Sequence, residues 1–181
     1  MKPFSKIKNP ITDEYLVFKS IVLSNSFPWY FNPESNPNLQ MEGFLSESFY
    51  SHTILQRPED HPQKLCPIPI SSIFNDFCVV IDQIFRFNGI EVNSLLRANL
   101  NCMYPDVLGN DKPTVPHYDH VFDYNHILIY LTDSGGNTIF LDDDIIEYEP
   151  NEDDIIIFPK CLHSNRLPQT KRRIVLVATY V

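Results

Sequence analysis

The sequence has no long apolar run and is poor in basic residues. No stretch approaches the roughly 18 consecutive apolar residues of a membrane-spanning helix, and Asp13 and Glu14 interrupt the N-terminus before any apolar run long enough for a signal peptide. With 14 Lys and Arg against 23 Asp and Glu, the formal net charge is −9, which disfavours nucleic acid and anionic membranes as partners. We therefore expect a soluble, cytoplasmic protein with neither kind of partner.

The sequence also has no closely spaced pair of cysteines and few glycines. The four Cys lie far apart with no C-x-x-C spacing, which disfavours a disulfide framework and a zinc knuckle. Five Gly against 15 Pro indicate stiff loops, and neither a repeat nor a low-complexity segment is present. A chain of 181 residues that is 43% hydrophobic fits one domain, residues 1–181, with one substantial core.

Two helices and a strand are expected in the first 93 residues. Thr12 is a candidate N-cap for a helix that reaches about Ser24. Residues 43–55 alternate as a strand does, and residues 70–87 have the clearest helical spacing of apolar side chains in the chain. We predict that residues 1–93 form a support region whose helices cover a sheet.

From residue 94 onward the pattern changes to short β-branched and aromatic runs. The expected strands are 94–103, 115–120, 126–132, 137–141, 145–148, 154–158 and 172–181. Strands at this spacing predict a β-sandwich or jelly roll over residues 94–181, and with the preceding helices the fold class is α+β. Residues 154–158 and 172–181 are apolar on both faces, as central strands are.

The sharpest chemical feature is His117-Tyr118-Asp119. Residues i and i+2 of a strand share a face, so His117 and Asp119 can converge on one ion. His163 follows the strand predicted at 154–158 and can supply a third ligand from the mouth of the same barrel. Two imidazoles and one carboxylate are the facial triad that holds iron(II) with open positions. By itself H-x-D is a weak signal, because isolated His and Asp residues are commonly exposed.

Basic residues and further histidines surround this motif. Arg173 follows His163 by ten residues and opens the last predicted strand, and a guanidinium is well suited to bind a carboxylate. Neighbouring strand residues point to opposite faces and both faces are apolar, so the residues alone leave open whether Arg172 or Arg173 faces the site. We expect His120 and His126 to be surface or hydrogen-bonded histidines, not ligands.

Taken in order, these elements resemble the 2-oxoglutarate/iron(II) dioxygenase superfamily, and within it the prolyl-hydroxylase-like branch and small oxygenases carried by bacteriophages. The matching segments cover about residues 94–181 and comprise Tyr104-Pro105, His117-Tyr118-Asp119, residues 128–132, 137–140 and 154–158, His163, and residues 173–175. If the likeness extends to the source, the protein is phage-encoded and acts in a host cell.

The resemblance implies a double-stranded β-helix with N-terminal helices packed on one sheet. It also implies an Fe(II)/2-oxoglutarate-dependent hydroxylase that uses O₂, with iron held at the open end of the barrel by His117, Asp119 and His163. Its substrate would be an unidentified peptide, protein or small molecule. The branch suggests prolyl residues of a peptide or protein, but a shared fold does not fix the substrate.

The resemblance further implies a set of cosubstrate contacts. Arg173 is favoured over Arg172 for the distal carboxylate of 2-oxoglutarate, because in the family the arginine directly precedes the β-branched run. Tyr130 matches a tyrosine that helps this arginine, and Tyr104 matches another tyrosine of the cosubstrate pocket.

Two other hypotheses fit part of the pattern. A cupin-like metal enzyme that uses no 2-oxoglutarate would need the triad, but it leaves Arg173 and Tyr130 without a role. A non-enzymatic jelly-roll binding module predicts no stoichiometric metal and tolerance of His117→Ala.

Overall fold

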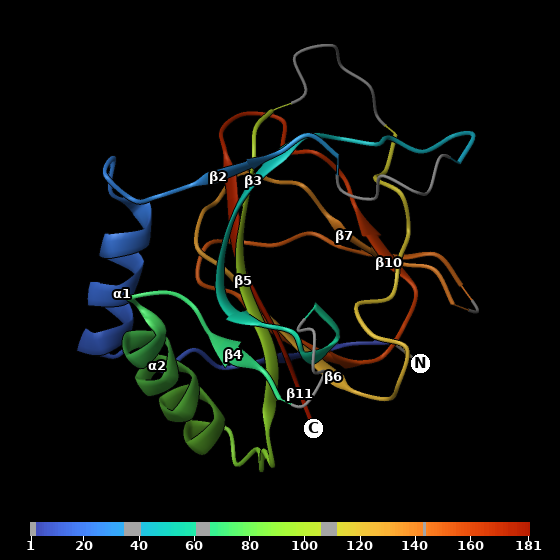
Figure 1. Ribbon diagram of the computed structural model, residues 1–181. Helices are drawn as coiled ribbons and strands as arrows, with labels where there is room; N and C mark the ends of the chain where they lie inside the picture. The colour runs from blue at the N-terminus through green and yellow to red at the C-terminus, as the bar shows by residue number, and fades with distance from the viewer. Residues whose placement is uncertain (1–2, 35–40, 61–65, 106–111, 143) are drawn as a thin grey trace.

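Two helices cover one face of a large antiparallel sheet, and a small sheet lies on the other side (Figure 1). The computed structural model describes residues 3–34, 41–60, 66–105, 112–142 and 144–181. The helices are α1 (Asp13–Leu23), the 3-10 turn η1 (Pro58–Asp60) and α2 (Phe74–Phe87). The strands are β1 (Ser5–Ile7), β2 (Tyr30–Asn32), β3 (Phe49–Gln56), β4 (Ile68–Pro69), β5 (Leu95–Met103), β6 (Asn125–Tyr130), β7 (Thr138–Phe140), β8 (Ile146–Tyr148), β9 (Ile155–Pro159), β10 (His163–Asn165) and β11 (Arg173–Tyr180).

Both predicted helices are confirmed. The Thr12 side chain caps α1 by accepting a hydrogen bond of 3.2 Å from the backbone N–H of Tyr15. Helix α2 buries Phe77, Val80 and Ile84 against the sheet, as the helical spacing of its apolar residues predicts. Among the described residues, no helix is both long enough and apolar enough to cross a membrane.

Among the described residues, the large sheet has eight strands in the order β1-β9-β6-β11-β5-β3-β2, with β4 beside β3, and the small sheet has the order β10-β7-β8. Strand β11 lies between β5 and β6 and is buried along its whole length. Ile174 and Leu176 pack in the helix-side core, whereas Val175 and Val177 face the barrel interior. This is the predicted α+β jelly roll, with β11 as a central strand that is apolar on both faces.

The segment predicted as a strand at 115–120 is not a regular strand. Its pairing consists of isolated bridges, Leu45 with Thr114 and His117 with His163. Pro113 and Pro116 have no backbone N–H to donate, so they prevent a continuous ladder. The strand expected at 43–55 likewise begins only at Phe49. The short strands β1, β2, β4 and β10 were not predicted, because two or three residues carry too little alternation to be recognised.

Candidate metal centre and carboxylate pocket

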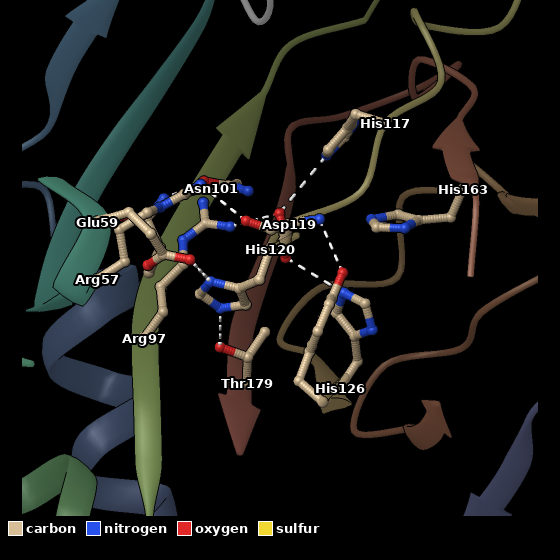
Figure 2. A network of polar contacts seen from close by, with 12 residues as sticks. Arg57, Glu59, Arg97, Asn101, His117, Asp119, His120, His126, His163 and Thr179 are labelled. Carbon is tan, nitrogen blue, oxygen red and sulfur yellow. Dashed lines mark hydrogen bonds and ion pairs between the residues drawn. The ribbon is translucent and has the colours of Figure 1, made fainter. Parts of the chain in front are cut away.

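The three predicted ligands come together at the open end of the barrel. His117 and His163 pair across an isolated bridge through backbone N–H···O bonds of 3.0 and 3.2 Å. Asp119 lies two residues beyond this bridge. One ligand atom from each of the three side chains lies within 4.8 Å of the others, and Figure 2 shows the side chains converging. The convergence results from the bridge to β10 and not, as expected, from strand alternation.

Backbone carbonyls fix the orientation of both imidazoles. Nδ1 of His163 lies 3.1 Å from the carbonyl oxygen of Cys161, and Nδ1 of His117 lies 3.3 Å from that of Val115. If Nδ1–H donates in each ring, Nε2 is left as a lone-pair donor, as in most histidine metal sites. Burial, together with a neighbouring imidazole, lowers the pKa of each histidine to about 4. Both rings are therefore neutral at pH 7, as metal binding requires.

Asp119 is a buried, ionised carboxylate that is held at both oxygens. Nη1 of Arg97 lies 2.6 Å from Oδ1, and Nε2 of His126 lies 3.2 Å from Oδ2. Burial raises the pKa of Asp119, but Arg97 and His126 outweigh it and hold the pKa well below its usual range. The register of β5, β11 and β6 places Arg97, Thr179 and His126 side by side beneath the carboxylate.

Only some of these supporting residues could be anticipated from the sequence. Arg97, Asn99 and Asn101 occupy alternate positions of β5, a pattern that indicates a polar inner face. His120 and His126 are both buried and hydrogen bonded, so the expectation of hydrogen-bonded histidines holds, but neither is exposed. The contact between His126 and Asp119 joins residues on a loop and a strand, and no spacing rule indicates it.

A cavity of about 160 Å³ is lined by two of the three ligands and by a buried arginine. His117, Asp119, Asn101 and Arg173 contribute to its wall. Arg173 is only 3% exposed. Its Nη2 lies 3.3 Å from Oγ1 of Thr138, whereas its Nε has no hydrogen-bond partner. Among the described residues no carboxylate forms an ion pair with this guanidinium, although the carboxylates of Asp119 and Glu47 line the same cavity.

Of the two candidate arginines, Arg173 lines the cavity and Arg172 does not. Arg173 shares the inner face of β11 with Val175, whereas Arg172 points to the helix side and donates to the carbonyl oxygen of Leu23 over 3.1 Å. The guanidinium of Arg173 lies over the ring of Tyr130, 5.3 Å from its centroid.

Thr138 and Gly136 are two small residues next to the Arg173 side chain. The hydroxyl groups of Tyr130 and Thr138 lie 2.7 Å apart, and Thr138 also contacts Arg173. Gly136 has φ +80°, and a Cβ there would lie 2.7 Å from Cδ of Arg173. Gly136 therefore leaves the space that the arginine side chain occupies, and neither it nor Thr138 was singled out from the sequence.

Tyr104 does not join the cavity. It is 55% exposed, and its ring makes an edge contact with Tyr50 at a centroid distance of 5.8 Å. Asn101 and Met103 line the cavity, so alternation directs Tyr104 to the opposite side. Its predicted contact with a cosubstrate has no support in this geometry.

Solved structures match nearly the whole chain. An oxidoreductase of the 2OG-Fe(II) oxygenase family from Burkholderia pseudomallei superposes with a TM-score of 0.70 at 14% identity, over 98% of this chain and 84% of that chain. The chain has the fold of the 2OG-Fe(II) oxygenases. A Pseudomonas putida prolyl-4-hydroxylase shows the same oxygenase fold with a TM-score of 0.57 at 13% identity, over 98% of this chain and 92% of that one.

The same fold also occurs in an epimerase. The non-heme alpha ketoglutarate dependent epimerase SnoN from nogalamycin biosynthesis matches with a TM-score of 0.60 at 10% identity, over 99% of this chain and 77% of that chain. No family model and no curated protein matches the sequence. At these identities the likeness establishes the fold, while the chemistry has to be argued from the site.

Proposed function

We propose that the protein is a 2-oxoglutarate- and iron(II)-dependent oxygenase that hydroxylates a C–H bond of its substrate. The observation that carries this proposal is the guanidinium of Arg173, which is buried without an ion-pair partner among the described residues, in a cavity that His117 and Asp119 also line. A buried charge without a counter-ion is costly. A carboxylate ligand that reaches from the metal to Arg173 would supply the missing charge.

The donor set fits iron(II). His117, Asp119 and His163 offer two neutral imidazoles and one carboxylate, the ligand set of non-heme iron oxygenases. The cavity fits a dicarboxylate because its two ends carry different chemistry. At one end are His117 and Asp119 of the triad, and at the other Arg173 can donate to a carboxylate beside the Thr138 hydroxyl.

Each group of the chain then has a defined task. His117, Asp119 and His163 would hold the ion, while Arg173 and Thr138, with the ring of Tyr130 beneath them, would fix the far carboxylate of the cosubstrate. When bound, iron(II), 2-oxoglutarate and O₂ supply the oxidising chemistry, in which the keto acid is converted to succinate and CO₂ and the substrate is hydroxylated.

The substrate class remains a proposal based on likeness. The Pseudomonas putida relative is a prolyl-4-hydroxylase, which supports a prolyl residue of a peptide or protein as the first class to test. An unidentified small molecule is the second class, supported by SnoN, an epimerase from nogalamycin biosynthesis with the same fold. We propose neither a nucleic acid nor a membrane as partner, in line with the formal net charge of −9.

Anaerobic titration of the purified protein with iron(II) and 2-oxoglutarate tests the proposal. Chelation of iron(II) by the keto acid gives a weak visible absorption band. We expect this band in the wild type and its loss in Asp119→Ala. If folded, iron-loaded protein gives no band with 2-oxoglutarate, the cosubstrate assignment is wrong and the cupin-like hypothesis becomes the better one. If it binds no iron at all, the non-enzymatic binding module is favoured.

A further inference from the structure

The loop that carries Asp119 lacks the hydrogen-bond ladder of a strand. Side chains satisfy the backbone of Asp119 instead. Its N–H donates to the hydroxyl oxygen of Tyr124 over 2.7 Å, and its carbonyl oxygen accepts from Nη1 of Arg57 over 2.9 Å. A ligand on such a loop keeps a fixed position only while these side chains hold it.

The next residue, His120, ties the same loop to two other parts of the fold. Its imidazole is fully buried, with Nδ1 lying 2.7 Å from Oε1 of Glu59 and Nε2 lying 2.8 Å from Oγ1 of Thr179. In the neutral tautomer that suits both partners, Nδ1–H donates to the Glu59 carboxylate and Nε2 accepts from the Thr179 hydroxyl. Figure 2 shows this chain of contacts running from Glu59 through His120 to Thr179, beside the triad.

The two residues that hold this loop from the N-terminal part of the chain, Arg57 and Glu59, belong to one short segment. Arg57 directly follows β3, and Glu59 lies in the turn η1. Nε of Arg57 also lies 3.4 Å from Oδ2 of Asp60 within this segment. Residues 57–60 precede β5, so they lie outside the segments that supply the triad and the buried arginine.

We propose that Arg57, Glu59, His120 and Thr179 form a brace that positions Asp119 for metal binding, so that a segment preceding the jelly-roll core completes the metal centre. The inference rests on the proposed metal site. These four are positioning residues, because each acts on the ion only through Asp119. Removal of a partner that orients a metal ligand typically weakens metal binding about 10- to 100-fold.

Cobalt(II) titration of the metal-free full-length protein, without 2-oxoglutarate, tests the brace. The visible cobalt spectrum reports the ligand geometry, and the titration gives the Kd. In Glu59→Ala we expect a Kd at least about tenfold higher and an altered spectrum. Glu59→Gln keeps an oxygen that can accept from Nδ1–H of His120, so it should bind cobalt(II) more like the wild type. Glu91→Ala and Glu91→Gln make the same changes at an exposed position between α2 and β5 and should alter neither measurement.

The outcomes separate the brace from a purely structural role. If folded Glu59→Ala binds cobalt(II) with the wild-type Kd and spectrum, and only its Tm falls, the inference is overturned while the proposed function stands. If Glu59→Ala does not fold, Thr179→Val tests the brace at the other nitrogen of His120 with little change in side-chain shape. An unchanged Kd for cobalt(II) in Thr179→Val also overturns the inference. If the wild type itself binds no cobalt(II), the metal site fails and the brace fails with it.

Discussion

Replacing Arg173 by Met should make the protein more stable and at the same time unable to bind 2-oxoglutarate tightly. The guanidinium is 3% exposed and has no carboxylate partner among the described residues, and burial lowers its pKa. Its charge is therefore a cost to the unliganded fold and becomes favourable only when an anion enters the cavity. Met fills a similar space without a charge, so the two effects have opposite signs.

The magnitudes follow from the desolvation of the charge. Removing one partner of a buried, hydrogen-bonded charge pair costs about 2–5 kcal/mol of binding free energy, which is at least about a 30-fold rise in the Kd for 2-oxoglutarate. Replacing buried ionic groups by well-packed apolar side chains of similar volume often stabilises a protein, by about 1–4 kcal/mol. For a chain of this length that corresponds to a rise in Tm of about 2–16 °C.

Thermal denaturation with and without cobalt(II) and 2-oxoglutarate measures both effects. A ligand at 100 times its Kd stabilises the native state by about 2.7 kcal/mol, so 2-oxoglutarate should raise the Tm of the cobalt-loaded wild type but hardly that of Arg173→Met. Arg172→Met is the matched control, because Arg172 donates to Leu23 on the helix side and does not line the cavity. A less stable Arg173→Met, or one that keeps the full response to 2-oxoglutarate, would refute the reasoning.

Two further predictions concern the same cavity. Gly136→Ala places a Cβ 2.7 Å from Cδ of Arg173 at a backbone φ of +80°. The substitution should lower the free energy of unfolding by about 1 kcal/mol or more and weaken 2-oxoglutarate binding in calorimetric titration. Unchanged binding would show that 2-oxoglutarate binding does not depend on the observed position of the Arg173 side chain. The pKa of His117 and of His163 is about 4 in the folded protein against an ordinary value of 6.5, so between these values the unfolded chain binds more protons than the native state, and denaturant-measured stability should fall as pH drops from about 6.5 to 4. Cobalt(II) affinity should accordingly stay nearly constant down to about pH 5. If the affinity instead falls with a midpoint near pH 6.5, the pKa values of His117 and His163 are not lowered by burial.

Local chemistry determined what could be predicted from the sequence. The Thr12 cap and the apolar spacing of α2 act within a few residues, and the structure confirms both helices. The apolar character of 172–181 on both faces correctly indicated a strand between two layers. His117, Asp119 and His163 do converge, although the expected strand at 115–120 is replaced by a bridge to β10 that depends on distant residues.

What could not be predicted depends on register across the sheet. The contacts of Asp119 with Arg97 and His126 exist because β5, β11 and β6 pair in one alignment, which no single segment encodes. Tyr104 shows the opposite case. The alternation of Asn101 and Met103 was readable in the sequence and would have directed Tyr104 away from the cavity.

Strand β11 sets the distance between two parts of the proposed site. Arg173 lies at its first residue and Thr179 near its end, both on the inner face, and this offset of six positions sets the distance between the buried arginine and the brace at about 20 Å along the strand. Because side chains alternate, inserting or deleting one residue between them would turn one of the two outward. A length change in this strand therefore cannot be absorbed by either site, and lineages of this fold should vary the composition of β11 far more readily than its length.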